Sequence, residues 1–389
     1  MISQMIASAE GRSLLVRADA ADFLHGALDA EAEPGGWVRP LRFLPPQVRA
    51  LGSCQAWHPG LYRQMARTAA GVSIEFETNA SRVALELVPD EEPVVTCRLR
   101  ERIFAPAESF DGVACEVDGR GGEPGWGEVL AVSIDGTGED AGPLPQGARL
   151  VSFVLDGAGE APGAVQVLPG FGATHHVRIW LPCLRGVRVR GLWGDGTAFT
   201  PVDPRPSLLA IGDGPTQGMA CGNPALAWPT RLSERLGFDL VNQGIHRQVF
   251  QSGMLSGLGA VNGIAGVVVA LGAAYRREPC QARLVARDVR AFLAELARLF
   301  PDAPIWVVTP LWHNADRVPE HAGSCISELG DLLAEGVAAH DRMELVDGLS
   351  LLDHRVALLA DAEEMPGAKG AHQIARRLET RIRESCDGL

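Results

Sequence analysis

Short runs of alternating apolar and polar residues fill the stretch from residue 71 to residue 193. They span residues 72–78, 82–88, 127–134, 148–155 and 176–181, and each ends near Asp-Gly, Gly-Asp or a proline. Alternation with a period of two indicates β-strands with one buried face, and these residue pairs are typical of turns. We therefore expect residues 1–200 to form an all-β, jelly-roll-like sandwich, with an edge strand and an irregular lead-in in its first seventy residues.

The pattern changes after the proline-rich junction PVDPRP at residues 201–206. Apolar runs at 208–211, 238–241, 267–271, 305–309 and 343–346 alternate with segments of helical periodicity, notably 281–300 and 326–339. This alternation predicts a parallel, doubly wound sheet in a second domain, residues 207–389. Ligands of such sheets bind beyond the carboxyl ends of the strands. The loops that open at Asp213, Gly244, Gly272 and Pro310 should therefore converge on one crevice.

Composition narrows the range of partners. The 389 residues carry a net charge of −13 and no basic run, which makes nucleic acid an unsuitable partner. No apolar run is long enough to cross a bilayer and the first residues lack the pattern of a signal peptide, so we expect a cytoplasmic protein without membrane association. The eight cysteines contain no Cys-x-x-Cys pair, and neither a metal nor a cofactor is expected. The oligomeric state stays open.

Two short motifs carry a family resemblance. The stretch GDGPTQG at residues 212–218, the helix-like segment 227–237 and the sequence NQG at 242–244 resemble the first blocks of the SGNH (GDSL-type) hydrolases. The resemblance covers residues 207–382 and implies a three-layer, flavodoxin-like α/β domain. Residues 58–62 and 71–79 resemble the N-terminal sandwich of a two-domain branch of that family. Some members of this branch act in actinobacterial natural-product pathways as esterases or acyl transferases.

The chain departs from this family at the residues that perform acyl transfer. In an active member a serine attacks the acyl carbon, an Asp-His pair activates it, and two backbone N–H groups and an asparagine bind the oxyanion. Here the resemblance places Gly214 at the serine, Ala274 at the asparagine, and Ala362 and Met365 at the Asp-His pair. Only the N–H groups of Gly214 and Gly244 remain as oxyanion donors. Four losses together indicate natural divergence rather than one engineered change.

Four residues near the expected crevice are candidates for catalysis: Asp213, His246, Tyr275 and His313. Imidazole is the side chain best suited to proton transfer near neutral pH. Each candidate has a structural alternative, such as an aspartate that holds its turn, a buried tyrosine or a histidine in a solvated loop. The residues expected to contact a substrate are Gly214, Thr216, Gly244, Arg247, Ala274, Trp312 and Met365.

Thr216, Trp312 and one charged segment can also be explained by a purely structural role. Thr216 is a candidate for capping the following helix. Trp312 can serve for packing alone. The charged segment of Asp361, Glu363 and Glu364 is expected to face solvent, with Asp361 as its best candidate for a site carboxylate.

Three functions stay open. Removal of the triad costs about six powers of ten in turnover, so ordinary ester hydrolysis is not expected, and Gly214→Ser alone should not restore it. Replacement of polar residues by Gly, Ala and Met favours an enlarged, less polar pocket. The leading hypothesis is an enzyme repurposed for a cyclisation, elimination or rearrangement of a small, apolar or polyketide-like intermediate of bacterial secondary metabolism. The alternatives are a non-catalytic protein that binds a ligand or partner, and an esterase or acyl transferase with another nucleophile, such as Thr216.

Overall fold

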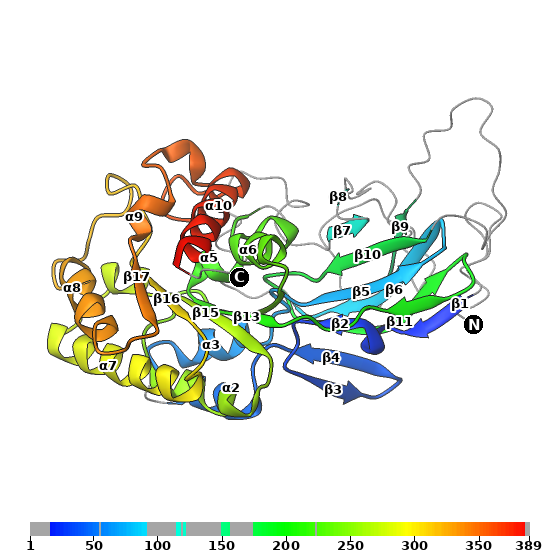
Figure 1. Cartoon of the computed structure of the whole chain (residues 1–389), viewed down its shortest axis with the longest axis horizontal. Helices are drawn as coiled ribbons and strands as arrows, with labels where there is room; N and C mark the ends of the chain where they lie inside the picture. The colour runs from blue at the N-terminus through cyan, green and yellow to red at the C-terminus, as the bar shows by residue number, and fades with distance from the viewer. Residues whose placement is uncertain are drawn as a thin grey trace.

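The computed structural model describes residues 16–53, 56–91, 114–117, 120–121, 149–155, 174–221 and 224–385. Figure 1 shows a β-sandwich domain packed end to end against an α/β domain. The strand expected at residues 127–134 lies outside the described residues. The other expected strands are confirmed. Their observed ends differ from the expected ends by one to a few residues, which is the usual uncertainty of strand boundaries.

Two antiparallel sheets form the sandwich. One has the order β3-β4-β11-β6-β9 with β1 beside β11, and the other has the order β12-β5-β10-β7-β8 with β2 beside β5. Apolar side chains from both sheets, among them Phe76, Leu85 and Ile179, are fully buried between them. The strands are β1 Val16–Asp19, β2 Leu24–His25, β3 Asp29–Glu33, β4 Trp37–Leu41, β5 Ser73–Thr78, β6 Arg82–Pro89, β7 Ala114–Val117, β8 Arg120–Gly121, β9 Arg149–Val154, β10 His175–Trp180, β11 Val187–Gly194 and β12 Phe199–Pro201.

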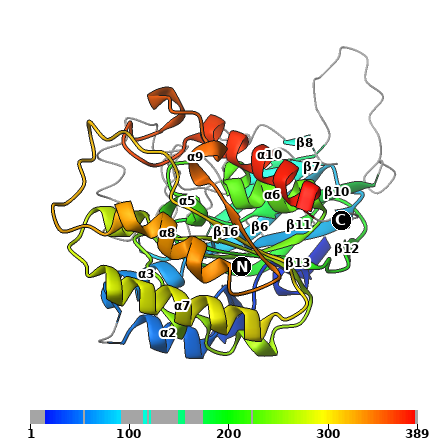
Figure 2. The same ribbon diagram turned by 60° about the vertical axis from the view of Figure 1, so that its left-hand side comes forward.

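The second domain is built on a parallel sheet with the strand order β14-β13-β15-β16-β17, which confirms the doubly wound prediction. Figure 2 shows α6 and α10 on one face of this sheet and α7 and α8 on the other. The strands are β13 Ser207–Gly212, β14 Asp239–Gly244, β15 Ile264–Ala270, β16 Ile305–Val308 and β17 Met343–Val346. The helices are α5 Gly214–Gln217, α6 Trp228–Leu236, α7 Ala282–Leu299, α8 Ile326–Val337, α9 Gly348–Leu351 and α10 Ala368–Ser385, with short 3₁₀ turns η4 Ser252–Leu255 and η6 Ala273–Arg276.

Part of the first seventy residues belongs to the core of the α/β domain. Helices α2 (Pro45–Leu51) and α3 (Pro59–Ala66) lie beneath the parallel sheet, beside α7 (Figure 1). Their buried side chains Leu51, Tyr62 and Met65 share one apolar cluster with Leu209 of β13 and Phe292 of α7. The expected domain boundary between residues 200 and 207 therefore separates the strands of the two domains, but it does not account for α2 and α3, which precede it in the chain and pack in the second domain.

A buried arginine fixes the end of β14 to the N-terminal segment. Arg42 is 0% exposed, and its guanidinium donates to the carbonyl oxygens of Asn242 at 2.9 Å and Gly244 at 2.8 Å. It also donates to the carbonyl oxygens of Met65 and Thr68. Burial lowers the pKa of Arg42 to about 9. This side chain thereby holds the strand end from which the loop with His246 departs.

A cluster of charged side chains joins the two domains. His25, Glu75 and Asp239 place their ligand atoms within 4.8 Å of one another, a spacing that a metal ion also accepts. Two guanidinium groups already face the carboxylates, however: Arg205 lies 2.6 Å from Glu75 and 2.7 Å from Asp239, and Arg178 lies 3.2 Å from Glu75. We therefore interpret this cluster as an ionic contact that holds the domains together.

Candidate active site

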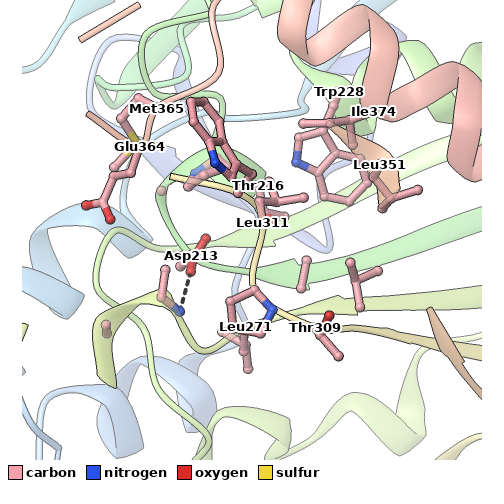
Figure 3. A pocket seen from close by; sticks show the side chains of 18 of the residues that line it. Asp213, Thr216, Trp228, Leu271, Thr309, Leu311, Leu351, Glu364, Met365 and Ile374 are labelled. Carbon is pink, nitrogen blue, oxygen red and sulfur yellow. Dashed lines mark hydrogen bonds between the residues drawn. The ribbon is translucent and has the colours of Figure 1, made fainter. Parts of the chain in front are cut away.

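A narrow cavity opens at the carboxyl ends of β13, β15 and β16 (Figure 3). Its lining includes Asp213, His246, Ala273 and Pro310, so the predicted convergence of these loops is confirmed. The space inside it is about 40 Å³, which holds roughly three water molecules. Bulky apolar side chains form much of its wall. The apolar part of the lining comprises Trp228, Leu271, Val308, Leu311, Trp312, Leu351, Met365, Ile374 and Leu378.

Asp213 is one of two carboxylates that line this cavity, with Glu364. It directly follows β13 and precedes the short helix α5, and its Oδ2 accepts a hydrogen bond from the N–H of Ala273 at 3.3 Å (Figure 3). The residue is only 7% exposed. Burial and, secondarily, the nearby Glu364 carboxylate raise the pKa of Asp213 to about 7. Asp213 therefore contributes both to the turn and to the cavity, where it can give or take a proton near neutral pH.

The imidazole of His246 occupies the space that a side chain at position 214 would need. A Cβ atom built on Gly214 would lie 2.9 Å from Nδ1 of His246, and 3.2 Å from both Sδ of Met219 and Cε of Met365. The backbone of His246 is held in place because its N–H donates to Oε1 of Gln217 at 3.0 Å. A histidine thus lies where the resemblance places the nucleophilic side chain.

The structure corrects the role expected for Gly244. Its N–H donates to Oδ1 of Asn242 at 2.8 Å within the same turn, and the residue is not among those that line the cavity. Glycine is needed here for packing, because a Cβ atom would lie 2.2 Å from the backbone nitrogen of Gln217 in α5. Arg247 does line the cavity, in a left-handed conformation with φ of 59°, and its carbonyl accepts the Tyr62 hydroxyl at 2.7 Å.

Two candidate catalytic residues lie away from the cavity wall. Tyr275 is 1% exposed, packs edge-on against Trp57, and accepts the N–H of Phe250 on its hydroxyl oxygen at 3.2 Å. This geometry favours the structural alternative, in which Tyr275 is a buried residue whose hydroxyl is hydrogen-bonded. His313 follows β16 but is not among the lining residues. Burial and the charge of Arg276 lower the pKa of His313 to about 4, so its ring is neutral at physiological pH.

The remaining predicted contact residues line the cavity: Gly214, Thr216, Ala274, Trp312 and Met365. Thr216 lies within α5 rather than at its cap, and its hydroxyl oxygen packs against Gly212, where a Cβ atom would approach it to 2.0 Å. The indole of Trp312 stacks on His354 with ring centroids 5.5 Å apart and an interplanar angle of 11°. One face of Trp312 is therefore used for packing.

The sequence interpretation missed a buried ion pair in the cavity wall. Glu364 is 8% exposed and lies 2.9 Å from Arg276 and 2.6 Å from Arg277, which corrects the expectation of a solvent-facing loop. Asp361 is also structural, because its Oδ1 accepts the backbone N–H groups of residues 363–365. Two features of the sequence could have indicated this ion pair: the adjacent arginines at 276–277 and the adjacent glutamates at 363–364, because each pair carries two charges of one sign.

The contact between His246 and Gly214 gives a direct test. Gly214→Ala and Gly214→Ser should both displace the imidazole, because the new Cβ atom would lie within 3.0 Å of Nδ1. The serine hydroxyl and the ring then compete for the same space, so Gly214→Ser is expected to hydrolyse p-nitrophenyl acetate no faster than Gly214→Ala. The ring signals of His246 in NMR spectra should move in both variants. Hydrolysis by the serine variant well above that of the alanine variant would contradict this interpretation.

Comparison with known proteins shows a shared fold. Neither a family model nor a curated protein sequence matches the chain. Among solved structures, it is similar to a protein from Bacteroides ovatus assigned as a GDSL-like lipase, with a TM-score of 0.65 and 16% identity over 95% of this chain and 97% of the other. It is similar to the salicylyl-acyltransferase SsfX3 of a tetracycline biosynthetic pathway, with a TM-score of 0.63 and 14% identity over 96% and 98%.

A family two carbohydrate esterase from Cellvibrio japonicus gives a TM-score of 0.58 and 12% identity over 95% of this chain and 97% of the other. The chain therefore has the two-domain, SGNH hydrolase-like fold of esterases and acyltransferases. Among the described residues, no helix combines the length and the hydrophobicity that a membrane span requires.

Proposed function

We propose that this SGNH hydrolase-like chain is an enzyme of bacterial secondary metabolism that catalyses a proton-transfer reaction, such as an elimination, cyclisation or rearrangement, on a small and largely apolar intermediate. One observation carries the proposal: a histidine ring fills the side-chain space beside Gly214, and the same cavity is lined by a buried aspartate, Asp213, whose pKa is raised to about 7. The two residues are adjacent to an apolar wall, where proton transfer is little affected by bulk water.

An elimination illustrates the assigned roles. His246 removes a proton from carbon, and the electrons of the broken C–H bond form a carbon–carbon double bond. Protonated Asp213 gives its proton to the departing oxygen, and water leaves. The proton on His246 then returns to Asp213 through solvent. Asp213 is the acid because burial and the Glu364 carboxylate both favour its protonated form.

Hydrolysis through an acyl-enzyme is disfavoured by the same geometry. Gly214 offers no nucleophile, the N–H of Gly244 is bound to Asn242, and the hydroxyl oxygen of Thr216 packs against Gly212. A binding protein without catalysis is the second candidate, and the narrowness of the cavity favours it: about 40 Å³ admits only a small group of any ligand.

Complementation of the native host tests these alternatives. A strain that lacks the gene should accumulate an intermediate, and the wild-type gene should remove it. Asp213→Asn should fail to do so, whereas Asp341→Asn, at an exposed aspartate, should succeed. Full complementation by Asp213→Asn, with the protein folded, would support the binding protein and exclude catalysis by Asp213. Hydrolysis of p-nitrophenyl acetate by the purified wild type at rates typical of esterases would favour the hydrolase instead.

A further inference from the structure

The inner end of the cavity contains a hydrogen-bond donor that the proposed proton transfer does not use. Trp228 is the first residue of α6 and is only 2% exposed, yet its Nε1 has no hydrogen-bond partner among the described residues. In Figure 3 the indole lies beside Leu351 and Ile374 with its nitrogen turned toward the open centre of the cavity. A buried indole N–H is normally bonded, because an unmade bond costs free energy.

The surroundings of this donor are apolar. Its neighbours in the cavity wall include Val308 of β16, Leu351 of α9, and Ile374 and Leu378 of α10. Trp306, in the same apolar cluster, offers a contrast, because its Nε1 donates to Oγ of Ser385 at 3.0 Å. The indole nitrogens of Trp180 and Trp193 also lack partners, but neither residue lines this cavity.

We propose that this inner end is a binding subsite for a small aliphatic group that carries an oxygen acceptor, a ketone, ester carbonyl or ether, with Trp228 Nε1 as the donor. The inference depends on the proposed function only in taking the cavity as the substrate site. A donor without an acceptor side chain beside it selects for an acceptor on the ligand, and apolar walls reject ligands with several polar groups. The small volume of the cavity, about 40 Å³, limits the group to a few heavy atoms.

Two probes of matched shape isolate the hydrogen bond. 2-Butanone and 2-methyl-1-butene differ in that an oxygen replaces a CH₂ group. Because the ketone loses hydration on burial and the alkene does not, the bond is isolated by a comparison of two proteins. The ketone-to-alkene affinity ratio should be about 2- to 12-fold higher in the wild type than in Trp228→Phe, the factor that one net hydrogen bond of 0.5–1.5 kcal/mol provides. Protein-observed NMR titrations give both affinities. The ketone alone should move one indole N–H signal downfield, and that signal should be absent in Trp228→Phe.

Two variants assign the effect. Trp228→Phe keeps an aromatic ring and removes the donor, so it should lower the affinity for the ketone by about 2- to 12-fold and leave the affinity for the alkene unchanged. Trp306→Phe also removes a buried indole, outside the cavity, and should change neither affinity. The same ketone-to-alkene affinity ratio in the wild type and in Trp228→Phe, or no binding of the ketone to the wild type at millimolar concentration, would overturn the subsite. If the variant does not fold, the wild type alone decides: a ketone that binds without moving any indole N–H signal downfield would overturn it.

The subsite and the proposed reaction fail in different experiments. Loss of ketone preference in Trp228→Phe, together with full complementation by Asp213→Asn, would leave the subsite standing and refute the proton transfer. Failure of Asp213→Asn to complement, together with the same ketone-to-alkene affinity ratio in the wild type and in Trp228→Phe, would retain the reaction and refute the role of Trp228.

Discussion

Asp213→Asn is expected to lower turnover of the accumulating intermediate by about 10²- to 10⁴-fold, the usual contribution of a positioned acid or base. The amide keeps the shape of the side chain and its acceptor for the N–H of Ala273, but it cannot transfer a proton. In the wild type, activity should fall as the pH rises through about 7, because Asp213 then loses the proton that it donates. This limb of the pH profile should be missing from any residual activity of the variant.

The same change is expected to stabilise the protein at alkaline pH. The folded chain holds the Asp213 proton up to a pH of about 7, whereas the unfolded chain releases it near the ordinary aspartate pKa of 3.8. The folded state therefore binds more protons between these values, and the contribution of this group to stability is lost as the pH rises from about 4 to about 7. At one pKa unit per 1.36 kcal/mol, the loss amounts to about 4 kcal/mol. Asparagine does not titrate, so the variant does not lose this stability as the pH rises.

Urea unfolding at two pH values measures this effect. The difference in unfolding free energy, variant minus wild type, should increase by about 3 kcal/mol between pH 4.5 and pH 8. Other titrating groups are common to both proteins and cancel in the difference. Asp341→Asn, at an exposed position, should change the free energy of unfolding by less than about 0.5 kcal/mol at both values. A difference for Asp213→Asn that does not vary with pH would show that its carboxyl is not protonated in the folded protein at pH 5–6.

The local pattern of the sequence was enough to predict most of the architecture. Period-two runs predicted β5, β6, β9 and β10 of the sandwich but not the central strand β11, and the alternation of apolar runs with helical segments predicted the parallel sheet and the crevice at its carboxyl edge. These features depend on neighbours within one element, so each is written in a short window of residues. The motifs at residues 212–218 and 242–244 were also recognisable in the sequence, because Gly212 and Gly244 permit the close contact of β13 and β14 with α5.

Contacts between distant segments could not be predicted in the same way. The contribution of α2 and α3 to the second core depends on how the two domains dock, and nothing in residues 45–66 alone specifies a partner. The filling of the Gly214 space by His246 depends on the path of the loop after β14, which Arg42 and Gln217 hold from outside that loop. The pairing of Glu364 with Arg276 joins residues 88 positions apart.

Glu75→Gln is expected to lower the free energy of unfolding by about 3–5 kcal/mol, the usual cost of removing one partner from a buried ion pair. Glu75 is 0% exposed in β5, and its carboxylate contacts Arg178 in β10 and Arg205 in the segment that leads into β13. Arg178 is 6% exposed, so the neutral amide leaves its charge buried with its nearest carboxylate lost and with Asp239 at 3.4 Å and the charge of Glu234 as the remaining compensation. Because the cluster spans both domains, the loss should also weaken their docking.

Guanidinium chloride unfolding of the purified variant measures the loss. Glu77→Gln is the matched control, since it makes the same change two residues along β5 at an exposed position, and it should alter the free energy by less than about 0.5 kcal/mol.

The charge cluster also makes stability depend on pH in acid. Its contacts lower the pKa of Glu75. Against the effect of burial, the hydrogen bond with His25 and the charge of Arg205 lower the pKa of Asp239 to about 2. A depressed pKa gives stability that is present above the unfolded value, 4.5 for Glu75, and is lost as the pH falls toward the lowered pKa of the folded state. The wild type should therefore lose stability faster than Glu75→Gln in this acid range, and a destabilisation below 1 kcal/mol at pH 7 would show that the cluster contributes little to holding the domains together.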